Sequence, residues 1–329
     1  MNELHRRTRA AIAAATCTPF ALLLALPCSA QGWPSKPVRM IVAFPPGGGT
    51  DLVARIVAPR LSESIGQPVV VDNRAGAAGL VGTEVAAKAA PDGHTLFLGT
   101  LGNLSVNPLL YSKLAFDVER DLQPVTNVVA VTFMLYAHPS MPVRSVKDLV
   151  ALARARPGQL NYASSGAGGA PHLGAELFNL LAGVRLVHVP YKGSAQSFTD
   201  VIAGHVPVTF DSLVQGLQYV KDGRLRALAT LGAKRSAVLP EVPSVGETLA
   251  GYDVTNWFGL VTQSAVPREI VARLNADVVK LLRTPDARDR LLALGAEPIG
   301  DTPEQFGAFM KAESRKWARV IGEAKIRAD

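Results

Sequence analysis

Short apolar runs alternate with amphipathic stretches along the chain from residue 38 onward. Val38 to Phe44 is a continuous apolar run, which is typical of a buried strand. The stretch 51–64 has apolar residues at helical spacing, and Pro59 is expected to kink this helix. The alternation continues with a strand over 69–71, a helix over 80–90 and a strand over 95–99. This order predicts a parallel sheet with helices on its faces.

A second alternating set begins with a long apolar stretch over 125–137, which predicts a strand region. Helices are then expected over 146–156, with Ser145 as the N-cap, and over 172–181, 197–202 and 217–221. The strands between them are expected over 160–164, 186–189, 206–210 and 225–230. One more strand is expected over 252–261, followed by helices over 267–282, 286–294 and 302–324.

The late helices have no strands of their own, so we expect them to pack on the first sheet. The chain would then leave a first lobe near Val125, build a second lobe, and return near Tyr252. Two crossings between two α/β lobes form a hinge with a cleft between the lobes. The expected lobes are therefore 31–127 plus 252–329, and 128–251.

Residues 1–30 have the layout of a secretory signal peptide. Three arginines within the first nine residues precede an apolar run, Phe20 to Leu26, and Cys28-Ser29-Ala30 offers small residues for cleavage. An uncleaved anchor and a lipoprotein are the alternatives, but the apolar run is short for a membrane span. We expect a mature protein that begins near Gln31 and resides in the periplasm.

The composition excludes several kinds of chemistry. Both cysteines, Cys17 and Cys28, lie in the predicted signal peptide, so the mature chain has no thiolate. The histidines include no pair at i, i+4 spacing and no H-E-x-x-H motif, so neither a metal nor a cofactor is expected. The formal net charge is +7, but the cations are spread along the chain, and nucleic acid is not an expected partner.

Three turns between predicted strands and helices are rich in glycine and small residues. They contain the candidate ligand-binding residues Phe44, Gly47, Gly48, Gly49, Thr50 and Asp51 in the first turn, Ser164, Ser165, Gly166 and Gly168 in the second, and Tyr191, Lys192 and Gly193 in the third. Each turn could be a plain connection. Together, however, they follow the carboxyl ends of parallel strands, where open α/β sheets bind ligands.

The first turn is the strongest candidate for an anion site, because its N–H groups precede a helix N-terminus. Gly48 is expected there with positive φ. Asp51 is expected to cap that helix, and Asp211 at the end of a later strand is equally a cap or a ligand contact. None of the turns has the Lys-Ser/Thr of a P-loop, the dinucleotide fingerprint or the G-x-S-x-G motif of a hydrolase.

Short segments along nearly the whole mature chain follow a known family pattern: 33–37, 44–51, 73–74, 89–93, 107–108, 162–166, 172–173, 188–193, 210–211, 225–229 and 239–245. In these segments the chain resembles the solute receptors of tripartite tricarboxylate transporters, also called the Bug family. The resemblance implies a class II periplasmic-binding-protein fold. It also implies that one ligand carboxylate sits against the first turn through backbone groups and ordered waters, while the second lobe holds the other end. Thr100 and Asn103 complete the expected contacts.

The second turn departs from the family pattern. Ala167, Gly169, Ala170 and Pro171 stand where more polar residues are common, and Ala75 stands where proline is common. Leu101 to Leu104 is also less polar than usual. These departures leave the fold unaffected but predict a pocket that accepts an apolar or aromatic body behind the carboxylate.

The sequence thus predicts a monomeric periplasmic protein that captures a small mono- or dicarboxylate for a membrane transporter of the tripartite tricarboxylate type. The expected protein is not an enzyme. The alternatives are a periplasmic hydrolase that uses Ser164 or Ser165, and a ligand-loaded receptor that signals to a membrane sensor.

Overall fold

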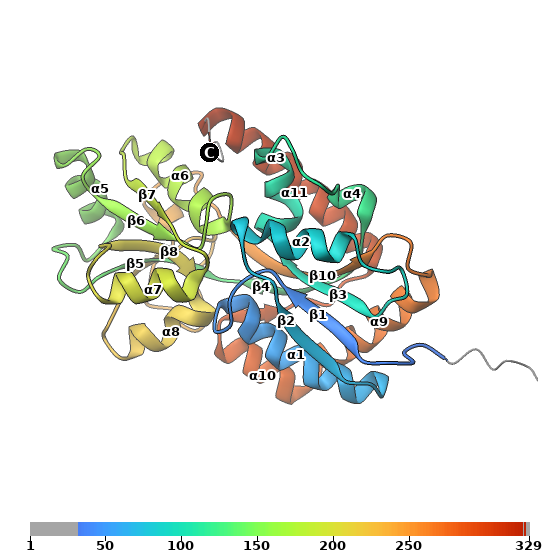
Figure 1. Cartoon of the computed structure of the whole chain (residues 1–329). Coiled ribbons are helices and arrows are strands. Elements are labelled where there is room, and N and C mark those ends of the chain that lie inside the picture. The colour runs from blue at the N-terminus through green and yellow to red at the C-terminus, as the bar shows by residue number, and fades with distance from the viewer. Residues whose placement is uncertain (1–31, 325, 327–329) are drawn as a thin grey trace, which may run out of the picture. The chain divides into compact units, whose positions relative to one another are not determined.

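The computed structural model describes residues 32–324 and 326 (Figure 1). The predicted signal peptide lies outside the described residues. The chain from Trp33 onward forms one compact unit by its internal contacts. Within the described residues, no helix is long and apolar enough to cross a membrane.

The first sheet has six strands in the order β11-β4-β10-β3-β1-β2. Their bounds are β1 Val38–Val42, β2 Val69–Asn73, β3 Thr95–Thr100, β4 Leu122–Val131, β10 Asn256–Gln263 and β11 Ala296–Pro298. The strand β1 pairs in parallel with β2 and β3, as the sequence predicted. The later strand β10 is inserted antiparallel between β3 and β4.

The second sheet has five strands in the order β7-β6-β8-β5-β9. Their bounds are β5 Phe133–Ala137, β6 Asn161–Ser164, β7 Val187–Pro190, β8 Val208–Ser212 and β9 Arg226–Thr230. The strand β6 is parallel to β7 and β8, whereas β5 is antiparallel to β8 and β9. The carboxyl ends of β6, β7 and β8 therefore lie at one edge, where the second and third turns follow.

The predicted strand region over 125–137 is made of two strands, since β4 belongs to the first sheet and β5 to the second. Thr132 separates them, and its backbone leaves both ladders: its N–H donates to the Gly295 carbonyl and its carbonyl accepts from the Leu213 N–H. Both strands are buried, so the apolar pattern runs on through Thr132 without marking the change of sheet. The return crossing follows β9 and ends at β10.

The helices agree in order with the sequence prediction. The main ones are α1 Gly49–Ile65, α2 Leu80–Ala87, α5 Val146–Ala155, α6 Ala170–Ala182, α7 Ser194–Ile202, α8 Leu213–Lys221, α9 Arg268–Leu282, α10 Pro285–Ala293 and α11 Pro303–Ala324. The sequence analysis missed several short elements: η1 Ala77–Gly79, the π-helical η2 Gly102–Val106, α3 Asn107–Leu110, α4 Val118–Asp121, η3 Val245–Glu247 and β11. Ser145 caps α5 as expected, since its hydroxyl accepts the Asp148 N–H at 3.2 Å. Pro59 lies inside α1, and a kink there stays a prediction.

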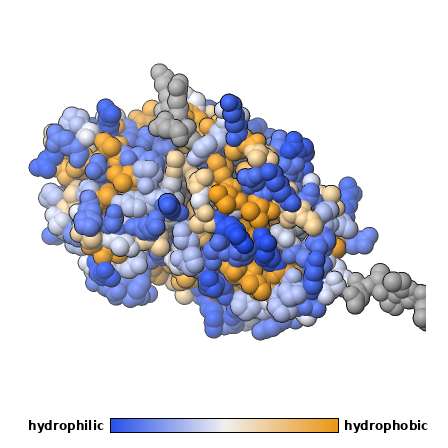
Figure 2. All heavy atoms as spheres, viewed as in Figure 1, coloured by the Kyte–Doolittle hydropathy of each residue, from blue (hydrophilic) through white to orange (hydrophobic). Residues whose placement is uncertain are grey.

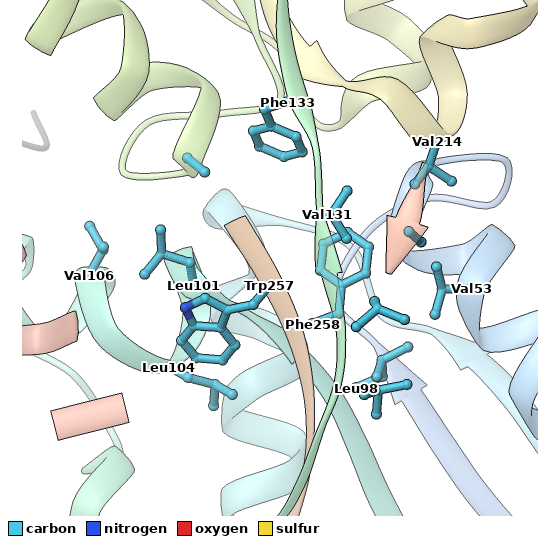
Figure 3. Close-up of a cluster of buried hydrophobic side chains, with 14 of the residues drawn as sticks. Val53, Leu98, Leu101, Leu104, Val106, Val131, Phe133, Val214, Trp257 and Phe258 are labelled. Atoms are coloured by element: carbon cyan, nitrogen blue, oxygen red, sulfur yellow. The ribbon is translucent and has the colours of Figure 1, made fainter. Parts of the chain in front are cut away.

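The core continues beneath the crossing from β4 to β5. Figure 3 shows Trp257 and Phe258 on opposite sides of β10, with Phe133 above them on the neighbouring chain segment. All three are at most 5% exposed. On the outer surface, hydrophobic residues show between hydrophilic ones (Figure 2), and Val70 on β2 and Val81 on α2 are among those exposed.

Candidate functional site

A narrow cleft lies where the Gly-rich turns of the two sheets meet. Its wall consists of Phe44, Pro45, Gly48, Gly49, Thr50, Thr100, Phe133, Ser165, Gly169, Ala170, Pro171, Ser194, Ser212, Asn256 and Phe258. The cavity between these residues is about 40 Å³. A wider hollow of about 1120 Å³ lies over α9 and α11, but none of the three turns contributes to it.

The N-terminus of α1 faces this cleft without a side-chain cap. Gly48 is the N-cap residue and has no side chain that could accept the N–H groups of the first turn. The first intrahelical bond runs from the Leu52 N–H to the Gly48 carbonyl at 3.0 Å. The N–H groups before Leu52 are therefore unclaimed by the helix, and the positive end of its dipole points toward Gly48, Gly49 and Thr50 in the wall.

Asp51 holds the first turn from behind, and its expected role as the cap of the helix is wrong. It lies in the first turn of α1 and is 1% exposed. One carboxylate oxygen accepts the Gly47 N–H at 2.9 Å and the Arg55 Nε–H at 2.8 Å, and the other accepts from Asn73 Nδ2 at 3.0 Å. Burial alone would raise the pKa of Asp51, but these hydrogen bonds outweigh it and lower the pKa.

The glycine that needs a positive φ in this turn is Gly47, at 82°, and the expectation for Gly48 is wrong. Gly48 has φ −76° and ψ 164°, which any residue can adopt. A Cβ at Gly48 would meet only the Pro45 carbonyl oxygen, at 3.5 Å. What Gly48 contributes is an N-cap position that leaves the helix N–H groups open.

The second turn also ends in a glycine cap, but most of its polar groups are used internally. Gly169 is the N-cap of α6 and provides no side-chain bond. The Gly166 N–H donates to Ser164 Oγ at 3.2 Å, and the Gly168 N–H donates to His172 Nδ1 at 3.0 Å. Only Ser165 among the serines and glycines predicted in this turn reaches the cleft wall.

Ser164 lies behind the turn in contact with a histidine. Its Oγ is 2.6 Å from His188 Nε2, and the Ser164 side chain is fully buried. The His188 ring stacks between Tyr162 and His172, with centroids 4.9 and 4.2 Å away. Burial and the neighbouring His172 lower the pKa of His188 to about 3, so it is neutral near pH 7.

The third turn leads into α7 through Gly193, which again provides no side-chain cap. Of the predicted residues here, Tyr191 donates to Asp200 at 2.6 Å and Lys192 is exposed, and neither lines the cleft. Gly193 lies against Pro45 of the first turn, where a Cβ would be 2.8 Å from the proline Cδ. The absence of a side chain at Gly193 thus lets the two turns approach each other.

Asp211 is buried behind the wall residues Ser194 and Ser212. Its Oδ1 accepts the Ser194 hydroxyl and the Ser212 N–H, both at 2.7 Å. Its Oδ2 has no hydrogen-bond partner among the described residues. Burial raises the pKa of Asp211 to about 7, against the lowering effect of these two hydrogen bonds.

The structure therefore brings only part of the predicted site to the cleft. Phe44, Gly48, Gly49, Thr50, Thr100 and Ser165 line it, whereas Gly47, Asp51, Asn103, Ser164, Gly166, Gly168, Tyr191, Lys192, Gly193 and Asp211 do not. Several of the latter support the wall. Asn103, for example, accepts both the N–H and the hydroxyl of Thr100, at 3.2 and 3.0 Å.

Nine wall residues are not among the predicted ligand contacts: Pro45, Phe133, Gly169, Ala170, Pro171, Ser194, Ser212, Asn256 and Phe258. Pro45, Gly169 to Pro171 and Ser194 belong to the recognised turns or directly continue them, so taking each turn as a whole into its helix would have included them. Phe133 and Phe258 look like ordinary strand residues. Asn256 is 1% exposed, and a buried amide at the start of a strand is the signal that could have pointed to it. In the part of the chain that the structure describes, no group of three potential metal ligands comes together.

Comparison with known proteins decides the family. The family model described as "Tripartite tricarboxylate transporter family receptor" matches residues 53–326. The chain belongs to this family. Among its relatives, protein BugT of Bordetella pertussis is 38% identical over 91% of the chain and 93% of BugT. The resemblance inferred from the sequence is confirmed.

Two solved structures are similar over most of this receptor's length. Rpa4515 of R. palustris, solved with adipate, has a TM-score of 0.88 at 38% identity, covering 90% of this chain and 99% of that one. MatC of Rhodopseudomonas palustris, solved with bound malate, has a TM-score of 0.84 at 31% identity, covering 88% and 100%. The predicted α/β periplasmic-binding-protein fold is confirmed, and the family is one of binding receptors.

Proposed function

We propose that this receptor captures a small carboxylate, whose carboxylate group binds at the N-terminus of α1. The observation that carries the proposal is the uncapped start of α1 in the cleft wall. A hydrogen bond to a charged group contributes roughly 1.5–3 kcal/mol. The helix dipole adds about 0.3–1 kcal/mol, or up to ~2 when partly buried. Two such bonds and the dipole are sufficient to make a carboxylate the dominant contact at this end.

The two sheets with their helices act in this proposal as two lobes. The sequence suggested 31–127 plus 252–329 and 128–251, but β4 stays in the first sheet to Val131, so the proposed boundaries move to the crossings themselves. The crossings at Thr132 and before Asn256 would serve as the hinge. The relatives solved with adipate and with malate support a carboxylate ligand for this chain, because their similarity extends over 90% and 88% of it.

The proposed setting is the periplasm, with a membrane transporter as the partner that takes up the ligand. Residues 1–30 would act as a signal peptide, so the mature protein would begin near Gln31 and lack both cysteines. The intact mass of protein purified from the periplasm tests this. A mass that includes residues 1–30 is the result that contradicts it.

The receptor is proposed to bind without catalysis. Ser164 and His188 have hydroxyl–imidazole contact, but Ser164 is fully buried and outside the cleft wall. An ester therefore has no access to its Oγ. Purified protein should not hydrolyse p-nitrophenyl esters, and turnover that disappears in Ser164→Ala would show that the protein is an enzyme.

A thermal-shift screen of small carboxylates tests the function itself. A ligand at 100 times its dissociation constant stabilises the folded state by about 2.7 kcal/mol. For a protein of this size, with an unfolding entropy of about 2.1 cal/mol/K per residue, that corresponds to a rise in Tm of about 4 °C. Carboxylates should raise Tm and their methyl esters should not. A panel in which no carboxylate raises Tm would overturn the proposal.

A further inference from the structure

The cleft wall is apolar apart from a few hydroxyl groups and one amide. Phe44, Pro45, Phe133, Pro171 and Phe258 supply most of its large side chains. Within the described part of the chain, no lysine, arginine or histidine lines it. Any anionic group of a ligand must therefore be stabilised by N–H and O–H donors alone. The number of ligand carboxylates then depends on how many free donors each side of the cleft offers.

The side formed by α6 lacks one backbone hydrogen-bond donor. Pro171 stands at the second position of this helix and has no N–H, so the start of α6 lacks an N–H group that the start of α1 has. The Gly166 and Gly168 N–H groups are already bound by Ser164 and His172. The start of α6 thus offers one backbone N–H fewer than the start of α1, and the donors that remain on this side of the wall are the Ser165 hydroxyl and the N–H groups of Gly169 and Ala170.

The side formed by α7 and α8 has a carboxylate of its own, Asp211, directly behind the wall, although the N-cap Gly193 leaves the first N–H groups of α7 without a side-chain partner. The Ser194 hydroxyl proton is committed to Asp211, so Ser194 offers only acceptor lone pairs to the cleft. No described cation contacts Asp211, in contrast to Asp51, which is paired with Arg55 at 2.8 Å. The Ser212 hydroxyl is the N-cap of α8, where it accepts the Val214 N–H at 3.2 Å.

Asn256 is the one side-chain amide in the wall and lies at the end of the return crossing. It is 1% exposed, and its Oδ1 has no hydrogen-bond partner among the described residues. A buried amide oxygen without a partner is unfavourable, so a bound molecule that donates to it is favoured. A neutral donor satisfies this oxygen, whereas a carboxylate can be met only by the Nδ2 group of the same side chain.

We propose that the ligand has a single carboxylate, bound at α1, and an apolar body that packs between Phe133, Pro171 and Phe258. Pro171 is the residue that determines this selectivity, because it removes a donor where a second carboxylate would bind. The cleft must widen from its present 40 Å³ to admit such a body. This inference rests on the proposed function and narrows it to monocarboxylates such as aliphatic or aromatic acids.

Isothermal titration with hexanoate, benzoate and adipate tests the inference. Hexanoate and adipate share a six-carbon chain and differ in the second carboxylate. The wild-type protein should bind hexanoate or benzoate at least tenfold more tightly than adipate. Pro171→Ala restores an N–H at the start of α6 and should raise the affinity for adipate relative to that for hexanoate about tenfold, because the loss of packing against Pro171 weakens both six-carbon acids alike.

Pro285→Ala is the matched control, because Pro285 also stands in the first turn of a helix but does not line the cleft. It should change neither affinity. Ala170→Ser, which adds a hydroxyl donor beside Pro171, is a second route to the same result should Pro171→Ala fold poorly. Wild-type protein that binds adipate at least as tightly as hexanoate, with no gain in either variant, refutes the selectivity but leaves the proposed function intact. Binding of none of these acids, nor of any carboxylate in the wider screen, refutes the proposed function.

Discussion

Replacement of Gly48 by aspartate should stabilise the fold and abolish binding at the same time. The N-cap position has φ −76° and ψ 164°, which suits aspartate, and a Cβ there meets only the Pro45 carbonyl oxygen at 3.5 Å. The new carboxylate would accept the N–H groups at the start of α1, which we assign to the ligand. Gly48→Asp would therefore place a permanent occupant in the proposed anion site.

The magnitudes follow from the cap and from the lost contacts. An aspartate N-cap exceeds glycine by a few tenths of a kcal/mol, and its charge at the helix N-terminus adds about 0.3–1 kcal/mol. The free energy of unfolding should thus rise by about 1 kcal/mol, or about 1.5 °C in Tm. Loss of two charged hydrogen bonds to the ligand is at least about 3 kcal/mol, which weakens binding more than a hundredfold.

Calorimetric titration and thermal unfolding of the same samples measure both effects. Thr284→Asp is the matched control, since Thr284 is the N-cap of α10, makes no side-chain cap bond and lies away from the cleft. It should raise Tm without changing affinity. A folded Gly48→Asp protein with normal affinity would place the carboxylate site elsewhere.

Three further substitutions test the residues behind the wall. Burial raises the pKa of Asp211 to about 7 from 3.8, so the folded state keeps a proton that the unfolded chain loses, and the free energy of unfolding falls as pH rises from about 4 to 7. Asp211→Asn should remove this dependence of the free energy of unfolding on pH, which is at most about 1.4 kcal/mol per pH unit. Denaturant titrations at pH 5 and 7.5 measure it, and the same pH dependence in both proteins would contradict the prediction. Gly47→Ala should destabilise the protein by roughly 1 kcal/mol, because φ is 82° there, and an unchanged Tm speaks against this. Gly193→Ala should weaken ligand binding at least tenfold with a small change in Tm, since its Cβ would meet Pro45 at 2.8 Å, and unaltered affinity shows that the turns need not approach closely.

The order of strands and helices could be predicted because each element has a hydrophobic periodicity of its own and is bounded by residues that begin or end such elements. Ser145 begins α5, as the sequence indicated, and glycines in the left-handed conformation end α1 and α6. The change of sheet at Thr132 could not be predicted, because the apolar run that ends β4 at Val131 continues directly into the fully apolar β5. The π-helical η2 could not be predicted either, since no periodic pattern distinguishes it from a loop.

The candidate site was predictable where it depends on backbone and unpredictable where it depends on side chains from distant segments. The first turn was identified because three glycines precede a helix. Asn256 and Phe258 reach the cleft only because β10 returns to the first sheet between β3 and β4. Sequence spacing also does not show that Asp51 turns back to the Gly47 N–H, which makes it a support of the turn.

The central claim is that N–H groups at the start of α1 recognise a carboxylate. Isothermal titration of the wild-type protein with the best acid from the thermal-shift screen, and with its primary amide, tests this most directly. The amide keeps the size and shape of the acid but removes its charge. We expect the amide to bind at least about a hundredfold more weakly, a difference of roughly 2.8 kcal/mol. Equal affinity for the acid and the amide would contradict the account.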